Sequence, residues 1–264
     1  MEKLEKIRDL DDLIHNEFEK YFPKTMKSKF SKKYPNTFHI SNLFIISTNF
    51  IKNSIFDCSE TDDLFGVKIL FRSQIEHFLR FKYVNFNWMK NQNDEASKRY
   101  LEFTEAREKL DQIKTAIAEH KLSNPEFQVE SWKKVFEDIP SLKKYSKKEI
   151  EQETLKYTCK NIIKTLKEID EKSETETSLF GSLIREYSEL SSFVHGGAGA
   201  HNQMFLFNEK RRREQEYLRI GGLAFQMAGT VKLFTLLMIV QIDIEHFKDH
   251  YLIIDELIKK VNKI

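Results

Sequence analysis

The chain has 264 residues, of which 32% are charged and 40% hydrophobic, and its formal net charge is +2. This composition excludes a disordered chain, and the small net charge means that any nucleic-acid site would have to be a local basic patch. The two cysteines, Cys58 and Cys159, lie far apart without a CxxC spacing, which favours a reduced, cytoplasmic protein and argues against a zinc site.

Apolar residues recur with a helical period along almost the whole chain, and no segment shows the convincing alternation of a strand. The sequence therefore predicts an all-α helical bundle, with residues 1–264 in a single domain. The Thr61–Asp63 run and Ser146 are expected N-caps. We expect helices at about residues 2–21, 38–57, 61–91, 94–121, 126–138, 147–171, 176–195, 208–242 and 243–262.

Two of these helices carry only a narrow apolar seam between charged residues, whereas those at 61–91 and 208–242 are apolar over a wide arc and should lie in the core. We therefore expect residues 94–171 to form a long charged helical hairpin that projects from the bundle. The alternative is that they form outer helices of the same bundle. The seams consist of Phe103, Ala106, Leu110, Ile113 and Ile117, and of Leu155, Cys159, Ile162, Leu166 and Ile169.

The segment from Ile220 to Ile242 is long enough to span a bilayer. Lys232 lies at its centre, and Gln226 and Gln241 interrupt it, which would be costly in hydrocarbon. We expect a buried core helix here rather than a membrane span. The N-terminal sequence MEKLEKIRDLDD lacks the apolar region of a signal peptide, so we expect a cytoplasmic protein.

The helix in the segment FRSQIEHFLR combines a large apolar surface with charged residues. Arg72, Glu76 and Arg80 follow one another at intervals of four, and His77 comes five residues after Arg72. On a largely buried helix such charges must pair, line a cleft or meet solvent on one narrow side. An ordinary ion pair between Arg72 and Glu76 is one reading, and a functional site is the other.

A second polar stripe consists of Arg185, Ser188, Ser192 and His195, which share one face of the helix that ends at His195. Three of the chain's eight glycines follow directly: Gly196, Gly197 and Gly199. This arrangement indicates either a small cavity beside the histidine, or a left-handed helix stop with serines that allow close helix packing. We expect the helices at 61–91 and 176–195 to pack together and to bring Arg72 or Glu76 near His195.

Three consecutive cations, Arg211, Arg212 and Arg213, lie near the start of the helix expected at 208–242, where they oppose the helix dipole. A phosphate partner or acidic residues on a neighbouring helix would explain them. The alternative is a solvated run balanced by the glutamates that flank it.

The spacing Arg72-x-x-x-x-His77 resembles the Arg-x(4–6)-His signature of the HEPN superfamily. These are all-helical bundles that include many metal-independent ribonucleases of bacterial defence and toxin systems. The Arg72/Glu76 helix, together with the later helix end from Ser192 to Gly196, also resembles an uncharacterised family of bacterial helical proteins.

The resemblance implies an endoribonuclease that acts as a toxin or phage-defence effector, without metal or cofactor, and as a homodimer. Arg72 would clamp the phosphate, His77 or His195 would transfer the proton, and Glu76 would orient a histidine. A neutralising or regulatory protein would be a further partner. The residues expected to bind RNA are Arg80, Arg185, Ser192, Arg211, Arg212 and Arg213.

Two other functions are compatible with the same residues. One is a non-catalytic helical interaction module in which Arg72, Glu76 and His195 form a buried network. The other is a module that senses a nucleotide or another small molecule in the same pocket.

Overall fold

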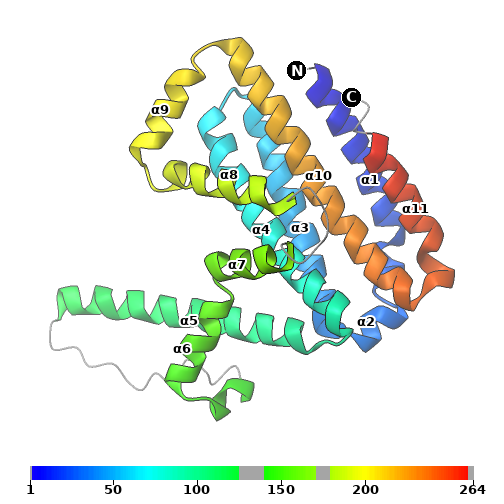
Figure 1. Cartoon of the computed structure of the whole chain (residues 1–264), viewed down its shortest axis with the longest axis vertical. Helices are drawn as coiled ribbons and strands as arrows, with labels where there is room; N and C mark the ends of the chain where they lie inside the picture. Colours follow the sequence, from blue (N-terminus) through cyan, green and yellow to red (C-terminus); the bar gives the residue numbers. More distant parts are fainter. Residues whose placement is uncertain (1, 125–139, 171–178, 261–264) are drawn as a thin grey trace.

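The computed structural model describes residues 2–124, 140–170 and 179–260, and within these ranges it contains eleven α-helices and no strand (Figure 1). The prediction of an all-α fold is confirmed. The short helix expected at 126–138 lies outside the described residues.

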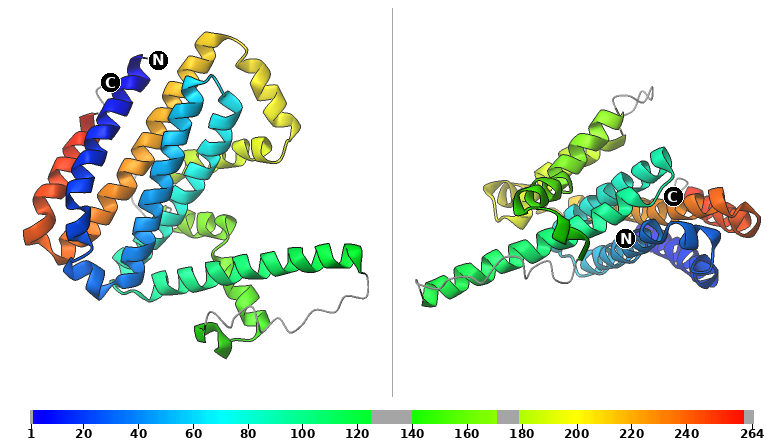
Figure 2. Two further views of the ribbon diagram at one scale, coloured as in Figure 1. Left: turned by 180° about the vertical axis from the view of Figure 1, so that it is seen from behind. Right: turned by 90° about the horizontal axis from the view of Figure 1, so that it is seen from below.

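Long helices that run side by side form the body of the molecule (Figures 1 and 2). The helices α3, α4 and α10 lie at its centre because they carry apolar residues over a wide arc. Fully buried residues on them include Ile55, Phe71 and Val231. The bundle consists of α1 (Glu2–Thr25), α3 (Pro35–Glu60), α4 (Leu64–Asn91), α10 (Lys210–Ile242) and α11 (Ile244–Lys260), and the short α2 (Lys29–Lys33) links α1 to α3.

Helix α10 is long and apolar enough to cross a membrane by length and composition, and 61% of its most apolar window is buried inside the molecule. Lys232 is buried in its centre, where its ammonium donates to Asn49 Oδ1 of α3 at 3.0 Å. The helix thus packs in the core, as the sequence indicated.

The region from 94 to 171 differs from the expected hairpin. Helix α5 (Glu95–Ser123) projects from the body, but the single helix expected at 147–171 is broken into α6 (Lys147–Lys156) and α7 (Cys159–Asp170) (Figure 1). Helix α6 packs against α5, whereas α7 packs against α4 and α8 (Leu179–Val194). The second seam is therefore divided: Leu155 is 55% exposed, whereas Ile162 and Leu166 are fully buried.

A tight corner joins α8 to α9 (Ala198–Leu206), a helix that the sequence did not lead us to expect. Gly196 has a φ of 64°, and the Gly197 N–H donates to the Ser192 carbonyl at 2.8 Å, which is the hydrogen bond of a left-handed helix stop. A Cβ added at Gly199 would lie 3.4 Å from the Ser192 side chain. The glycines after His195 therefore build a corner with close helix approach, the second of the two readings.

Replacing Gly196 with alanine should lower the free energy of unfolding by about 1 kcal/mol, because a side chain there must adopt a left-handed backbone conformation. Gly222, inside α10, is the matched control, since its added Cβ would only touch Ile7 at 3.9 Å. Gly222→Ala should stabilise the protein by roughly 0.5–1 kcal/mol. Urea unfolding of both variants measures the two effects, and a neutral Gly196→Ala would contradict this account of the corner.

Candidate functional site

A polar network joins the middle of α4 to the inner face of α8. Arg72 donates from Nε to Ser191 Oγ at 3.3 Å and from Nη2 to the Tyr187 hydroxyl at 2.9 Å. Its Nη1 lies 3.7 Å from Glu76 Oε2, and the Tyr187 hydroxyl donates to the same oxygen at 3.3 Å. The guanidinium also lies over the Tyr187 ring. Each of the three guanidinium nitrogens of Arg72 thus lies near a protein acceptor.

Arg80 continues the network one turn further along α4. It donates to Glu76 Oε1 from Nε and Nη2, at 3.1 and 2.7 Å. Its Nη1 donates to the Tyr100 hydroxyl and to the Tyr157 carbonyl, at 3.3 and 3.1 Å. Burial tends to raise the pKa of Glu76, but the two arginines outweigh it and hold that pKa below its usual value.

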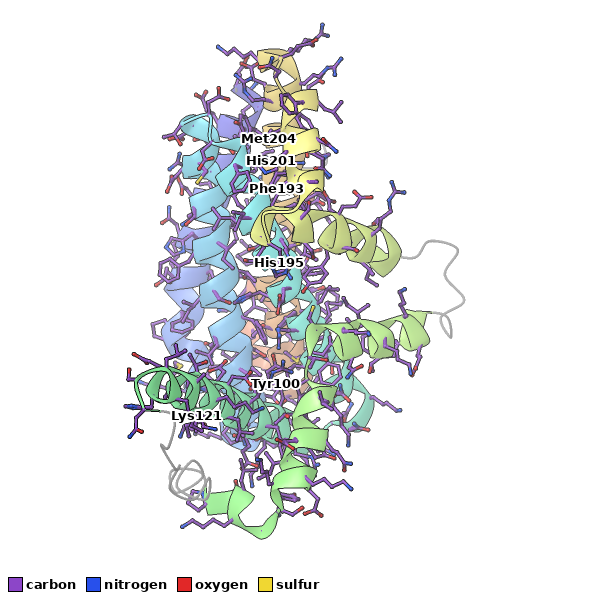
Figure 3. The ribbon with its side chains drawn as sticks, turned by 90° about the vertical axis from the view of Figure 1, so that its left-hand side faces the viewer. Tyr100, Lys121, Phe193, His195, His201 and Met204 are labelled. Atoms are coloured by element: carbon purple, nitrogen blue, oxygen red, sulfur yellow. The ribbon has the colours of Figure 1, made fainter. Side chains whose placement is uncertain are left out.

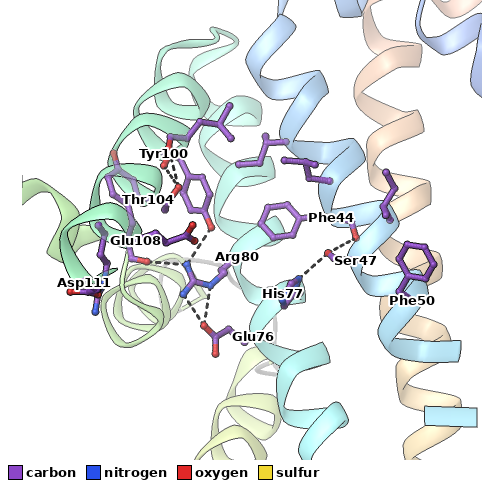
Figure 4. A pocket seen from close by; sticks show the side chains of 16 residues that line it. Phe44, Ser47, Phe50, Glu76, His77, Arg80, Tyr100, Thr104, Glu108 and Asp111 are labelled. Carbon is purple, nitrogen blue, oxygen red and sulfur yellow. Dashed lines mark hydrogen bonds and ion pairs between the residues drawn. The ribbon is translucent and has the colours of Figure 1, made fainter. Parts of the chain in front are cut away.

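An open groove of about 670 Å³ lies beside this network, between α3, α4 and α5 (Figure 4). The α3 wall is apolar, with Leu43, Ile46 and Phe50, whereas α4 and α5 supply polar and charged groups. The acidic, basic and histidine side chains that line it are Glu76, His77, Arg80, Arg107, Glu108 and Asp111. Carboxylates therefore outnumber guanidinium groups by one in the lining.

His77 and Arg72 face different parts of the molecule. His77 points from α4 toward α3, where Nδ1 lies 2.8 Å from Ser47 Oγ, and it lines the groove (Figure 4). Burial lowers the pKa of His77, which favours its neutral imidazole. Arg72 faces α8 and does not line the groove. Of the two residues of the Arg-x-x-x-x-His spacing, His77 lines this groove and Arg72 does not.

The helices α4 and α8 pack together as expected, but through another face of α8. The inner face carries Tyr187 and Ser191, whereas Arg185 is exposed and His195 is an exposed residue just after the end of α8. Arg185 pairs with Glu189 on its own helix, and Ser192 donates to the Glu189 carbonyl. In the described part of the chain no hydrogen bond or ion pair joins the His195 side chain, at the α8–α9 corner of Figure 3, to Arg72 or Glu76.

The arginines at the start of α10 meet acceptors from neighbouring elements. Arg213 forms a bidentate salt bridge with Asp62, from Nε to Oδ1 at 2.9 Å and from Nη2 to Oδ2 at 2.8 Å. It also donates to the backbone carbonyls of Phe207 and Asn208. Arg212 pairs with Glu209 and donates to the carbonyl of Leu206, the last residue of α9. Arg211 is exposed. Two of the three cations thus bind the carbonyl end of α9 and an acidic neighbour, which explains a basic run at a helix N-terminus.

Sequence reasoning missed the partners of the α4 charges on other helices, which are Tyr100, Tyr157, Tyr187 and Ser191. It also missed Lys68, one turn before Arg72, which is buried and paired with Glu216 of α10. A signal for Lys68 was present, because it extends the four-residue spacing of Arg72, Glu76 and Arg80 toward the helix start. Within the described ranges, no group of three His, Cys, Asp or Glu side chains is placed to hold a metal ion.

The sequence of this region matches a known family profile, described as a family of unknown function (DUF5677), over residues 38–212. The chain belongs to this family. No curated protein and no solved structure matches it. The DUF5677 segment contains the whole α4 network and the groove, whereas α1, α11 and nearly all of α10 lie outside it. The network and the groove are therefore features of the DUF5677 part of this chain.

Proposed function

We propose that this protein is a non-catalytic helical interaction module, in which the network of Arg72, Glu76 and Arg80 is a structural support and the surface around the groove binds a partner. The observation that carries the proposal is that both guanidinium groups are occupied by protein acceptors. A phosphate clamp needs a guanidinium fork that is free to donate to the ligand. Here a phosphate would first have to displace Glu76, Tyr187 or Ser191.

The charge of the groove supports the same function. Glu76, Glu108 and Asp111 face it, and its two arginines are paired with Glu76 and Asp111. Affinity for RNA comes largely from lysine and arginine side chains that neutralise phosphates. A groove with a net negative lining lacks that source of affinity, whereas its exposed apolar wall suits a protein partner.

The second candidate function is metal-independent RNA cleavage, as the resemblance to HEPN ribonucleases implies. One observation favours it: His77 and Arg80 line the same open groove. A neutral His77 could accept a proton from a ribose hydroxyl, since a general base must be deprotonated before it accepts a proton. In this candidate Arg80, rather than Arg72, would be the cation nearest to the substrate.

Total RNA incubated with the purified protein, with and without EDTA, distinguishes the two functions. The interaction module should leave the RNA intact in both conditions. Cleavage that resists EDTA and is lost in His77→Ala would overturn the proposal and establish the second candidate.

The thermal stability of Arg72→Ala is the companion measurement. The change should destabilise the protein by about 2 kcal/mol, because it removes the two hydrogen bonds that Arg72 donates to the half-buried Tyr187 and Ser191 hydroxyls and its ion pair with Glu76. Arg185→Ala is the matched control, since Arg185 forms only an exposed pair with Glu189 and should be nearly neutral. Equal stability of the two variants would count against a structural role for Arg72.

A further inference from the structure

The solvent-facing side of α3 carries an apolar stripe without charge. Between Lys33 and Lys52 the chain has no Asp, Glu, Lys or Arg, although 32% of all its residues are of these types. Leu43, Ile46 and Phe50 lie on one side of the helix and are 46%, 47% and 67% exposed. Depletion of charge around exposed aromatic and aliphatic side chains is typical of the centre of a protein–protein interface.

The same face combines a protruding ring with a hollow that can receive one. Phe50 projects at one end of the stripe, and the groove opens along it. Phe44, Tyr100 and Leu101 line one part of the groove, whereas Arg107, Glu108 and Asp111 line it further along α5. Figure 4 shows the Phe44 and Tyr100 rings on this wall. Aromatic anchors that enter such pockets carry much of the binding energy of protein interfaces.

We propose that the partner for this surface is a second copy of the chain, and that the two α3 helices pack antiparallel about a twofold axis near Ile46. The proposal rests on the proposed function and names its partner. A twofold interface requires a patch that is complementary to itself. Two copies of an uncharged stripe can pack together without like-charge repulsion. Because the same face carries both a protruding ring and a groove, the ring of each copy can enter the groove of the other.

The register of the two helices follows from the position of the axis. In an antiparallel pair centred on Ile46, a residue four positions after the centre lies opposite a residue about four positions before it. The Phe50 ring of the second copy thus lies opposite Asn42 and Leu43, over the part of the groove that Tyr100 and Leu101 line. Each copy contributes one ring and receives one.

The more exposed apolar pair at the end of α9 does not offer the same fit. Phe205 and Leu206 at the end of α9 are 79% and 61% exposed. The hollow beside Leu206, of about 280 Å³, is lined mostly by charged and polar side chains, with Lys68, Glu216 and Arg219 among them. A phenylalanine from a second copy would have to displace ion pairs there, so the α9 pair serves as a control surface.

Sedimentation equilibrium of the full chain and of Phe50→Asp tests the interface. The wild type should be a dimer, and Phe50→Asp should weaken the dimer by roughly thirtyfold or more, because the substitution removes a central anchor and places a carboxylate in an apolar contact twice. Phe205→Asp, an equally drastic change at an exposed ring, should leave the dimer unchanged. A monomeric wild type at high micromolar concentration, or a dimer that loses affinity in Phe205→Asp and not in Phe50→Asp, overturns the proposal.

Cysteine cross-linking gives an independent readout that does not depend on weakening the dimer. Ile46→Cys places two thiols next to the proposed axis, so mild oxidation should link the two copies covalently, whereas Phe205→Cys should not be linked. The wild type controls for the native Cys58 and Cys159. Failure of Ile46→Cys to cross-link while Phe205→Cys does so overturns the α3 interface. Neither result depends on whether the protein cleaves RNA, so the dimer and the proposed function can fail separately.

Discussion

Replacing Lys52 with methionine should lower the free energy of unfolding by about 3 kcal/mol, because it leaves the Asp11 carboxylate without its cation in the protein interior. Lys52 is fully buried on α3, its ammonium is paired with Asp11 of α1, and it also donates to Asn49 Oδ1 at 3.0 Å. A chain of this size loses roughly 2–4 °C per kcal/mol, so the melting temperature should fall by about 10 °C.

The double variant Lys52→Met with Asp11→Leu should recover most of this loss, because apolar side chains of similar volume replace a buried ion pair at little cost. Lys6→Met is the matched control, since Lys6 forms an exposed pair with Glu2 and its loss should cost well under 1 kcal/mol. Thermal and urea unfolding of the three variants measure these effects. Equal losses in Lys52→Met and Lys6→Met would contradict the assigned role of the buried pair.

Periodicity predicted the helices of the body well because each packs one apolar arc against a neighbour. Helix α4 was expected at 61–91 and is observed at Leu64–Asn91, with Asp63 as the N-cap that accepts from the Gly66 N–H at 2.9 Å. Ser146 likewise caps α6 in a capping box with Glu149. Such signals are local, since they depend on residues within one or two turns.

Periodicity did not predict the break between α6 and α7, because one regular apolar pattern there packs against two different sets of helices. The apolar spacing from Leu155 to Ile169 continues without a fault across Tyr157 and Thr158, although the helix stops there. The residues before the break lie against α5 and those after it against α4 and α8. Sequence spacing describes which residues share a face of a helix, but it does not say which element covers that face.

At the candidate site, contacts within one helix could be predicted from the sequence, whereas contacts between helices could not. The pairing of Glu76 with Arg72 and Arg80 was readable because a spacing of four places side chains on one face of a helix. The sequence did not show which face of α8 packs against α4, because both the Arg185/Ser192/His195 stripe and the Tyr187/Ser191 pair have helical spacing. Contact with α4, more than a hundred residues earlier in the chain, decides between them.

Lys232 should make the stability of this protein depend on pH in the alkaline range. Burial lowers its pKa to about 8, and repulsion from Lys52 adds to this effect while Asp11 opposes it. Its ammonium donates to Asn49 Oδ1, an oxygen that Lys52 also binds, so two cations share one neutral acceptor. An unfolded lysine has a pKa of about 10.4.

The direction of the effect follows from these two pKa values. Below pH 8 the Lys232 ammonium is charged in both the folded and the unfolded protein, so the full free-energy cost of burying the charge lowers the free energy of unfolding. Between pH 8 and about 10.4 the folded protein has released a proton that the unfolded chain still binds, so the contribution of Lys232 to the free energy of unfolding rises with pH. The rise over the whole window is about 3 kcal/mol.

Lys232→Met removes this cost at every pH and leaves Asn49 bound to Lys52. The variant should therefore be more stable than the wild type at pH 7, by up to about 3 kcal/mol, and the advantage should shrink as the pH rises from 8 to 10. Urea unfolding of both proteins at several pH values measures the difference, in which the titrating groups that do not interact with Lys232 cancel. An advantage that stays constant from pH 7 to pH 10 would show that Lys232 keeps an ordinary pKa, and that the interior between α1, α3 and α10 holds two permanent cations beside a single carboxylate.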